Sequence, residues 1–102
     1  MVALEIYLIK HSIQENNIGV QEEIEQETIC PIIKHEDIYS NEFYEANQAG
    51  FKPELRLRIS ALNYDNEKEI KYNGIRYSVI RTSVPNLDEI ILICERKVGN
   101  GN

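Results

Sequence analysis

The fold class of this chain is decided by residues 55–61, which read Leu-Arg-Leu-Arg-Ile-Ser-Ala. Its apolar residues stand at every second position, namely Leu55, Leu57, Ile59 and Ala61. Successive side chains of a strand point to opposite faces of the sheet, so this alternation places one face in a core and the other outside it. The pattern predicts a half-buried strand with a basic outer face, because Arg56 and Arg58 occupy the positions between.

A hairpin and a closing strand are expected after this stretch. Residues 69–72 and 75–82 are two runs rich in Ile and Tyr, and Asn73-Gly74 separates them. An Asn-Gly pair between such runs favours a type I′ turn, because both central residues of that turn take a positive φ. Residues 89–98 contain the run Ile-Ile-Leu-Ile-Cys, which is apolar on both faces. We expect this last strand to be covered on both sides, either inside the fold or by a partner.

Two further strands are expected before residue 55. Residues 3–13 combine β-branched and aromatic side chains and end at a polar turn region. Residues 21–39 are also rich in β-branched side chains, but Pro31 disturbs their spacing. Because proline cannot donate a hydrogen bond to a strand ladder, Pro31 marks an edge, a bend or a bulge.

The one predicted helix covers residues 40–50, Ser-Asn-Glu-Phe-Tyr-Glu-Ala-Asn-Gln-Ala-Gly. Gly50 is its expected C′ residue, the position where a residue with positive φ commonly ends a helix. Phe43 and Ala46 fall on one stripe, so we expect them to close one end of the hydrophobic interior. Tyr44 lies on a neighbouring stripe and should face outward.

These segments predict one domain with a mostly β fold. Six strands with one short α-helix between the second and third favour a small six-stranded β-barrel, closed or nearly closed. No linker, internal repeat or low-complexity stretch divides the chain. We assign residues 1–98 to this single domain and residues 99–102, Gly-Asn-Gly-Asn, to a flexible tail.

The charge narrows the functional classes. The 102 residues include 11 basic and 17 acidic ones, a net charge of −6, and such a surface repels the phosphates that nucleic-acid-binding proteins neutralise. Residues 1–50 hold ten acids against two bases, whereas residues 51–102 hold seven acids against nine bases. Either the surface is mixed and solvated, or an acidic flank of one subunit meets a basic flank of the next.

No segment indicates a membrane or an oxidising compartment. A spanning helix needs about 18–20 consecutive apolar residues, and residues 1–12 carry Glu5 and Lys10 inside their apolar run, unlike a signal peptide. Cys30 and Cys94 lie in β-like runs without metal-site spacing. We therefore expect a soluble, cytoplasmic protein with two buried free thiols.

A catalytic or metal site has few candidates. The residues with suitable chemistry are His11, His35, Asp37 and Ser40. In a strand, His35 and Asp37 could share one face while Glu36 could not, and two ligands do not make a metal site. The acidic run 22–27 could hold a divalent cation or meet a basic partner, but a solvated face is the simpler interpretation. The sequence therefore predicts no catalytic, cofactor-binding or metal-binding residue and no enzymatic activity.

Two motifs in the chain resemble a known family. Residues 41–54 read NEFYEANQAGFKPE and residues 71–82 read KYNGIRYSVIRT. In this order and at this separation, with a strand between them and an apolar strand after them, they resemble the head-tail joining family of tailed bacteriophages. The resemblance spans about residues 32–96, and the preceding residues match only as a generic pair of strands.

The resemblance implies a structural protein of the virion. Members of the family look like small barrels that form a ring beneath the portal and its adaptor, close the DNA-filled head and offer a docking surface for the tail. The implied partners are further copies in a sixfold or twelvefold ring, the adaptor–portal complex, and the tail terminator or the end of the tail tube. Packaged DNA would lie in the ring channel without sequence-specific contact, and no cofactor or membrane is implied. The implied location is the bacterial host cytoplasm during assembly and then the head-tail connector.

Five residues are the candidates for the partner interface: Tyr44, Glu45 and Gln48 on the helix, and Arg56 and Arg58 on the following strand. Two alternative functions stay open. One is a neighbouring small connector, such as a tail terminator or a tail-completion protein, which shares the size and the ring assembly. The other is an OB-like module for single-stranded nucleic acid, for which six tyrosines offer stacking surfaces but the acidic charge is unfavourable.

Overall fold

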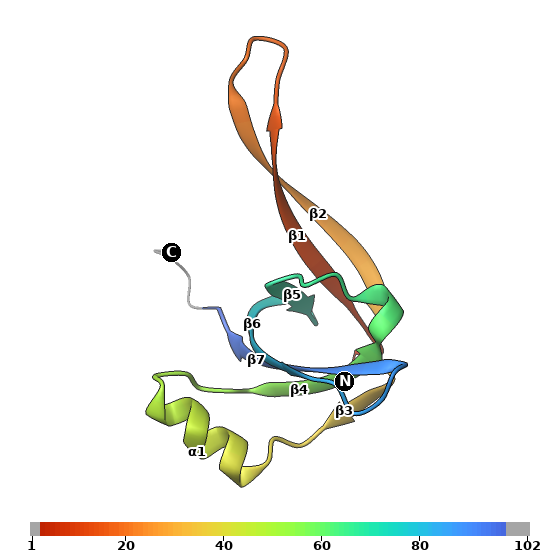
Figure 1. Ribbon diagram of the computed structural model, residues 1–102, viewed down its shortest axis with the longest axis vertical. Coiled ribbons are helices and arrows are strands. Elements are labelled where there is room, and N and C mark those ends of the chain that lie inside the picture. Colours follow the sequence, from red (N-terminus) through yellow and green to blue (C-terminus); the bar gives the residue numbers. More distant parts are fainter. Residues whose placement is uncertain (1–2, 98–102) are drawn as a thin grey trace.

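The computed structural model describes residues 3–97. Its elements are β1 (Glu5–Glu15), β2 (Gln21–Pro31), β3 (Lys34–Glu36), α1 (Ser40–Gln48), β4 (Leu55–Ser60), the 3-10 turn η1 (Ala61–Asn63), β5 (Glu69–Tyr72), β6 (Ile75–Ser83) and β7 (Glu89–Arg96). The strands form one antiparallel sheet in the order β2-β1-β5-β6-β7-β4-β3. Figure 1 shows a curled sheet from which the β1–β2 hairpin projects. The predicted mostly β fold with one helix is confirmed.

The predicted strand over residues 21–39 breaks after Pro31 into β2 and β3. Ile32 donates its backbone N–H to the Leu4 carbonyl at 3.0 Å, whereas Ile33 donates to the Arg58 carbonyl at 2.8 Å. The chain therefore leaves β1 and joins β4 between these two residues, which is the bend that the proline indicated. The helix consequently follows the third strand, and the predicted position between the second and third strands is wrong.

The sheet has seven strands and is not closed, so the expectation of a closed six-stranded barrel is corrected. Its two edges are β2 and β3. All neighbouring strands in the sheet are antiparallel. The edge strands β2 and β3, at the first and seventh places in this order, therefore run in the same direction. β3 follows β2 after a bend of two residues, so the chain passes directly from one edge of the sheet to the other. The two edge strands do not pair with each other within the described residues.

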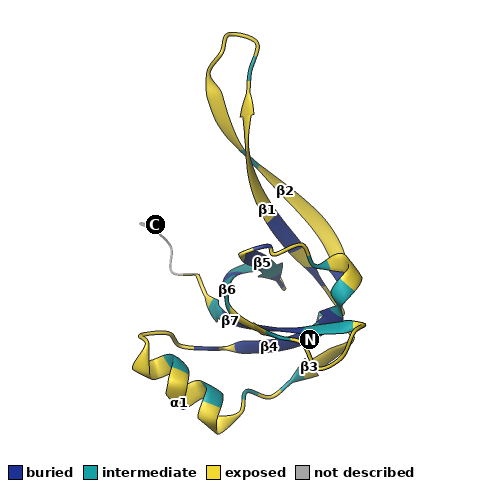
Figure 2. Ribbon diagram, in the orientation of Figure 1, coloured by how far each residue is buried: buried dark blue, intermediate teal, exposed yellow. Residues whose placement is uncertain are grey.

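The concave face of the sheet holds the hydrophobic core. Its buried residues are Ile6, Leu8, Cys30, Leu55, Leu57, Ile59, Ile70, Tyr72, Tyr77, Leu92 and Cys94. The predicted inward positions Leu55, Leu57 and Ile59 are confirmed, because all three are buried, whereas β4 ends at Ser60 and Ala61 begins η1 without being buried. Figure 2 shows that burial concentrates in the curled sheet, whereas the projecting hairpin and α1 are exposed.

The convex face carries a second layer. On β7, Leu92 and Cys94 face the core while Ile91 and Ile93, each 2% exposed, lie on the other face. This confirms that the last strand is covered on both sides. Helix α1 lies over the convex face, next to Ile93, and none of its residues is buried. The expectation that Phe43 and Ala46 close the interior is wrong, because no residue of α1 belongs to the core and Phe43 is 47% exposed.

The turn geometry agrees with the sequence at two positions. Asn73 and Gly74 have φ values of 54° and 82°, as a type I′ turn requires. Gly50 has a φ of 90° and follows the C-cap Ala49, which confirms it as the residue that ends α1. The predicted tail, residues 99–102, lies outside the described residues. Within residues 3–97, no helix is long and apolar enough to cross a membrane.

Candidate partner-binding surface

The most exposed element of the fold is the outer part of the β1–β2 hairpin, residues 10–29, which we call the arm. The two strands pair without interruption from Glu5 opposite Pro31 to Glu15 opposite Gln21. β5 pairs with β1 only at Tyr7–Ile9, so beyond that point the hairpin has no third strand. None of the residues from 10 to 29 is buried, and Figure 1 shows the arm projecting from the sheet.

The arm carries apolar side chains that the described residues leave largely exposed. Ile13 is 71% exposed and Ile18 is 82% exposed, and Val20 and Ile29 are also exposed. An isolated two-stranded hairpin is at best marginally stable in water. Exposed apolar side chains on such a ribbon make it a candidate interaction surface.

The arm is also acidic, and the acids divide into two groups. Near the sheet, Glu25 pairs with Arg76, and Glu27 Oε2 lies 3.0 Å from Lys71 Nζ. Nearer the tip, and counting only partners among residues 3–97, Glu15 and Glu22 form no ion pair and Glu23 pairs only with His11. Glu22 Oε1 also accepts a hydrogen bond of 2.9 Å from Asn16 Nδ2. The carboxylates at the tip therefore have no lysine or arginine partner within these residues.

His11 lies at the base of the arm in an ion-pair network. Its Nε2 atom is 3.2 Å from Glu69 Oε1, and His11, Glu25 and Glu69 lie close enough together to resemble a metal-binding group. Arg76 and Lys97 also contact Glu69, so cationic side chains already neutralise it. Burial would raise the pKa of Glu69, but hydrogen bonds from Lys97 and His11 outweigh it and lower that pKa. The network ties the arm to β5.

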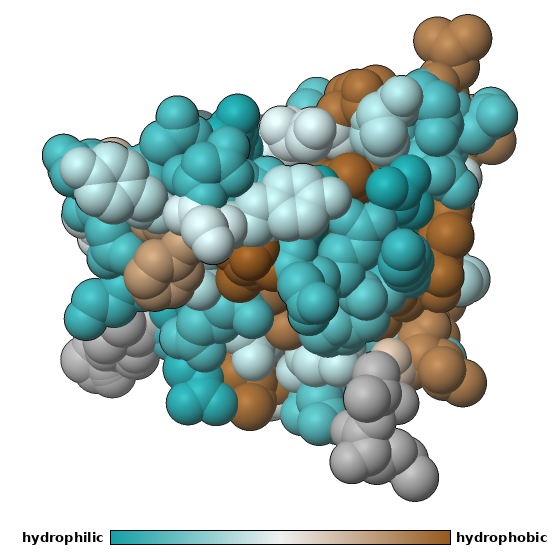
Figure 3. Space-filling view, turned by 90° about the horizontal axis from the view of Figure 1, so that it is seen from below, coloured by the Kyte–Doolittle hydropathy of each residue, from teal (hydrophilic) through white to brown (hydrophobic). Residues whose placement is uncertain are grey.

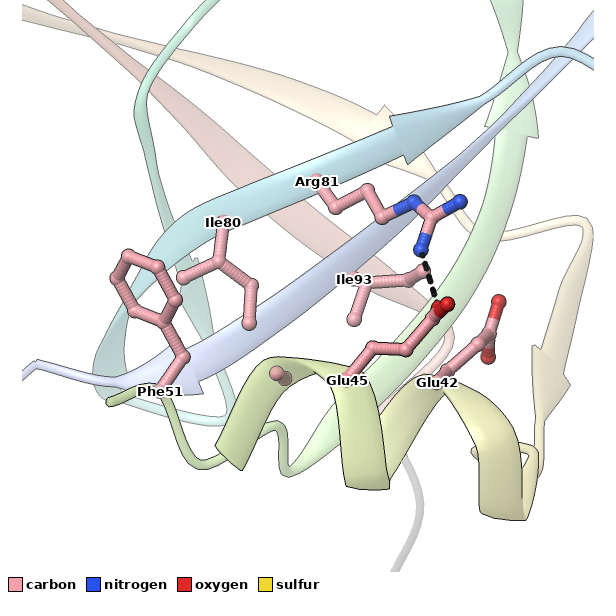
Figure 4. Close-up of a pocket in the computed structure, with 7 residues that line it drawn as sticks. Glu42, Glu45, Phe51, Ile80, Arg81 and Ile93 are labelled. Carbon is pink, nitrogen blue, oxygen red and sulfur yellow. Dashed lines mark hydrogen bonds and ion pairs between the residues drawn. The ribbon is translucent and has the colours of Figure 1, made fainter. Parts of the chain in front are cut away.

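A first hollow lies between α1 and the convex face of the sheet. It has a volume of about 160 Å³ and is lined by Glu42, Glu45, Ala46, Phe51, Ile80, Arg81 and Ile93. Figure 4 shows Phe51 and Ile80 beside each other at one end of this hollow and Arg81 reaching toward Glu45 at the other. Arg81 Nη1 and Glu45 Oε1 are 3.5 Å apart, and both side chains are more than half exposed.

A second hollow is also bordered by Ile80 and Arg81 of β6. It has a volume of about 230 Å³ and is lined by Tyr64, Asn66, Lys68, Val79, Ile80, Arg81 and Thr82. Its lining includes two cations and no carboxylate. The β6–β7 register shifts between Val79 and Arg81, so Ile80 is the extra residue of a β-bulge, a feature that redirects side chains. We call the two together the β6 hollows.

The five predicted interface residues fall into two groups. Tyr44 is 66% exposed, and Glu45 and Gln48 are exposed as well. Figure 3, seen from below Figure 1, shows apolar side chains reaching the surface in separate places among hydrophilic ones. Arg56, by contrast, is only 5% exposed, so the expectation of an exposed basic face is wrong there. The assignment of all five to a partner interface stays a prediction.

Arg56 and Arg58 find their acidic neighbours within the chain. Arg56 pairs with Glu36 and Glu42, and Arg58 pairs with Glu36 and Glu89. The acidic first half and the basic second half of the sequence thus meet partly within one chain. Sequence patterns could not show this, because alternation indicates the outer face of a strand and not what lies over that face.

The catalytic candidates are dispersed. His35 and Asp37 border one surface hollow together with Glu36, and the His35 ring lies 5.5 Å from the Tyr72 ring. Ser40 is the first residue of α1, and His11 lies in the network at the arm. Sequence reasoning missed the arm tip and the β6 hollows. The exposed Ile13 and Ile18 in polar surroundings were the available signal for the arm.

No protein-family model matches the chain, and no curated protein is significantly similar to it. The motif residues and the geometry of these surfaces are therefore the features that bear on function.

Proposed function

We propose that this protein is a structural subunit of the head-tail connector of a tailed bacteriophage. Copies of it form a ring that closes the DNA-filled head and offers a docking surface to the tail. The arm carries this proposal: residues 10–29 expose aliphatic side chains and unpaired carboxylates on a hairpin that no other strand supports. A surface of this kind is suited to an assembly subunit, whose exposed elements become buried between molecules.

The positions of the two family-like motifs support the same proposal. The first motif, residues 41–54, forms α1 and its exit, and the second, residues 71–82, forms the β5–β6 turn and most of β6. Both contribute to one hollow, because Phe51 comes from the first motif while Ile80 and Arg81 come from the second. Segments that are far apart in the sequence thus build one surface.

The proposal places the protein among non-enzymatic virion components. Its partners would be further copies of itself, the adaptor–portal complex and the end of the tail, and it would pass from the host cytoplasm into the connector. An OB-like nucleic-acid module is less well supported, because the largest exposed element is an acidic arm that repels phosphates. The second candidate is a tail terminator or tail-completion protein, because such proteins are also small and assemble into rings.

Deletion of the gene from an inducible phage tests the proposal and separates it from the second candidate. A missing head-closure ring should leave filled heads that lose their DNA, together with complete but unattached tails. Purified protein added to fresh filled heads should retain the DNA and restore tail attachment. Heads that keep their DNA beside defective tails would support the tail-terminator role. Infectious particles formed without the protein would overturn both.

A further inference from the structure

The tip of the arm and the β6 hollows have complementary chemistry. The arm tip, residues 13–24, presents the exposed aliphatic residues Ile13, Ile18 and Val20. Beside them stand Glu15, Glu22 and Glu23, none of which pairs with a lysine or arginine among the described residues. The tip is thus both apolar and negatively charged.

The second of the β6 hollows offers the opposite charge around an apolar floor, because its lining includes Lys68 and Arg81 and no carboxylate. The lining of the first includes Glu42 and Glu45, which pair with Arg56 and Arg81. Ile80 borders both hollows, with Phe51 on one side and Val79 on the other. Lys68 forms no ion pair within residues 3–97, and the Arg81 side chain is 58% exposed beside an exposed Glu45. Because an exposed ion pair contributes little, Arg81 remains available to other carboxylates.

The arm cannot reach the hollows of its own chain. Its strands are held in one continuous ladder of eleven residue pairs, from Glu5–Pro31 to Glu15–Gln21, and Figure 1 shows this ribbon extending away from β6 and α1. Two arms should not bind each other either, because the acidic side chains along their edges repel. An arm tip that occupies the hollows must therefore belong to a second molecule. The contact also cannot be one between two arm tips.

We propose that the arm tip of one copy docks into the β6 hollows of the next copy. Its aliphatic side chains cover Ile80 and its neighbours, and Glu15 and Glu23, which share one face of the hairpin with Ile13, face Lys68 and Arg81 at the second hollow. Such a contact joins two different surfaces, so each copy keeps a free arm and a free hollow, and repetition produces a ring where the rotation closes. The inference of a closed ring depends on the proposed connector function. The inference of the contact itself depends only on the chemistry of these two surfaces.

Reciprocal charge reversal tests the contact with the full-length protein. The arm variant Glu15→Lys/Glu22→Lys/Glu23→Lys and the hollow variant Lys68→Glu/Arg81→Glu each place like charges at every contact. Sedimentation velocity, at concentrations up to about 1 mM so that weak association is seen, should show assembly of the wild type and a loss of at least tenfold in association for each variant. An equimolar mixture should assemble again, because every contact between the two variants joins opposite charges.

The control is Glu5→Lys/Glu54→Lys/Asp88→Lys, which changes the net charge as much as the arm variant does but lies outside both surfaces. It should assemble as the wild type does, and circular dichroism should show that all variants fold. A mixture that stays monomeric, reversals without effect, or a wild type that does not associate at about 1 mM would overturn the contact. Sedimentation of the purified protein tests only the contact between copies. The connector function is tested separately, by the gene-deletion experiment described above.

Discussion

Arg56 and Glu36 lie directly opposite each other on β4 and β3, and Arg56 Nε donates a hydrogen bond of 2.9 Å to Glu36 Oε1. Arg58 Nε donates to the second carboxylate oxygen, Oε2, at 2.7 Å. The side chains of Glu36 and Arg56 are only 8% and 6% exposed. Arg56 also pairs with Glu42 of α1, so these residues tie the edge strand and the helix to the same part of the sheet.

Glu36→Gln should lower the free energy of unfolding by about 1.5–3 kcal/mol near pH 7, because it weakens two charge-assisted hydrogen bonds, while Arg56 keeps Glu42 and Arg58 keeps Glu89 as partners. Burial alone would raise the pKa of Glu36, but the hydrogen bonds from Arg56 and Arg58 lower it below the ordinary value of 4.5. A carboxyl group with a lowered folded pKa contributes stability above its unfolded pKa and loses that contribution as the pH falls through the folded value. The difference between the wild type and the variant should therefore shrink as the pH falls below 4.5.

Urea denaturation of both proteins at neutral pH and at about pH 3 measures this difference. Glu27→Gln is the control, because its ion pair with Lys71 is partly exposed and such pairs contribute about 0–1 kcal/mol. A gap that stayed constant down to the lower pH would show that the Glu36 charge is not the source of the stability.

Phe43→Ala should have a small effect on stability. Its side chain is 47% exposed on the outer helix, so we expect a loss of about 1 kcal/mol or less, well under the 3–5 kcal/mol typical of a buried phenylalanine. Leu57→Ala, in the core with no exposed surface, should cost about 2–5 kcal/mol. Urea denaturation of the two variants compares them, and an equal loss in both would mean that α1 packs more deeply than its exposure indicates.

Tyr44→Ala and Gln48→Ala should leave the fold nearly unchanged and weaken assembly. Both residues are exposed on α1, and exposed substitutions usually change stability by no more than about 0.5 kcal/mol. Melting temperatures and tail-attachment assays measure the two effects, with the exposed Asn41→Ala on the same helix as the control. Normal attachment by both variants would remove α1 from the partner interface.

The two cysteines should be unreactive in the folded protein. Cys30 and Cys94 are free and fully buried, and burial raises the pKa of Cys94 to about 12. Since the thiolate is the reactive form, neither thiol should react with a thiol-specific dye at neutral pH until urea unfolds the chain. Rapid labelling of the native protein would indicate that the core opens locally.

Local features of the sequence determined much of the fold. The alternation in residues 55–61 identified β4 and its buried face, and Asn73-Gly74 identified a turn with two positive φ values. These features are decided by neighbouring residues, through the two-residue period of a strand and the steric freedom of glycine. The same reasoning marked Pro31 as an edge, a bend or a bulge, but it did not show that the chain bends there from one edge strand of the sheet to the other.

The sequence by itself thus determined a mostly β domain, its buried strands and an exposed Tyr44. The tertiary structure decided the rest: that the sheet stays open, that Arg56 is covered by Glu42 of α1, and that the arm stands without a third strand. The physical reason is that periodicity reports which side of an element faces the core, whereas the cover over the opposite side depends on segments distant in the chain. Only the folded arrangement brings those segments together or, as at the arm tip, leaves the surface exposed.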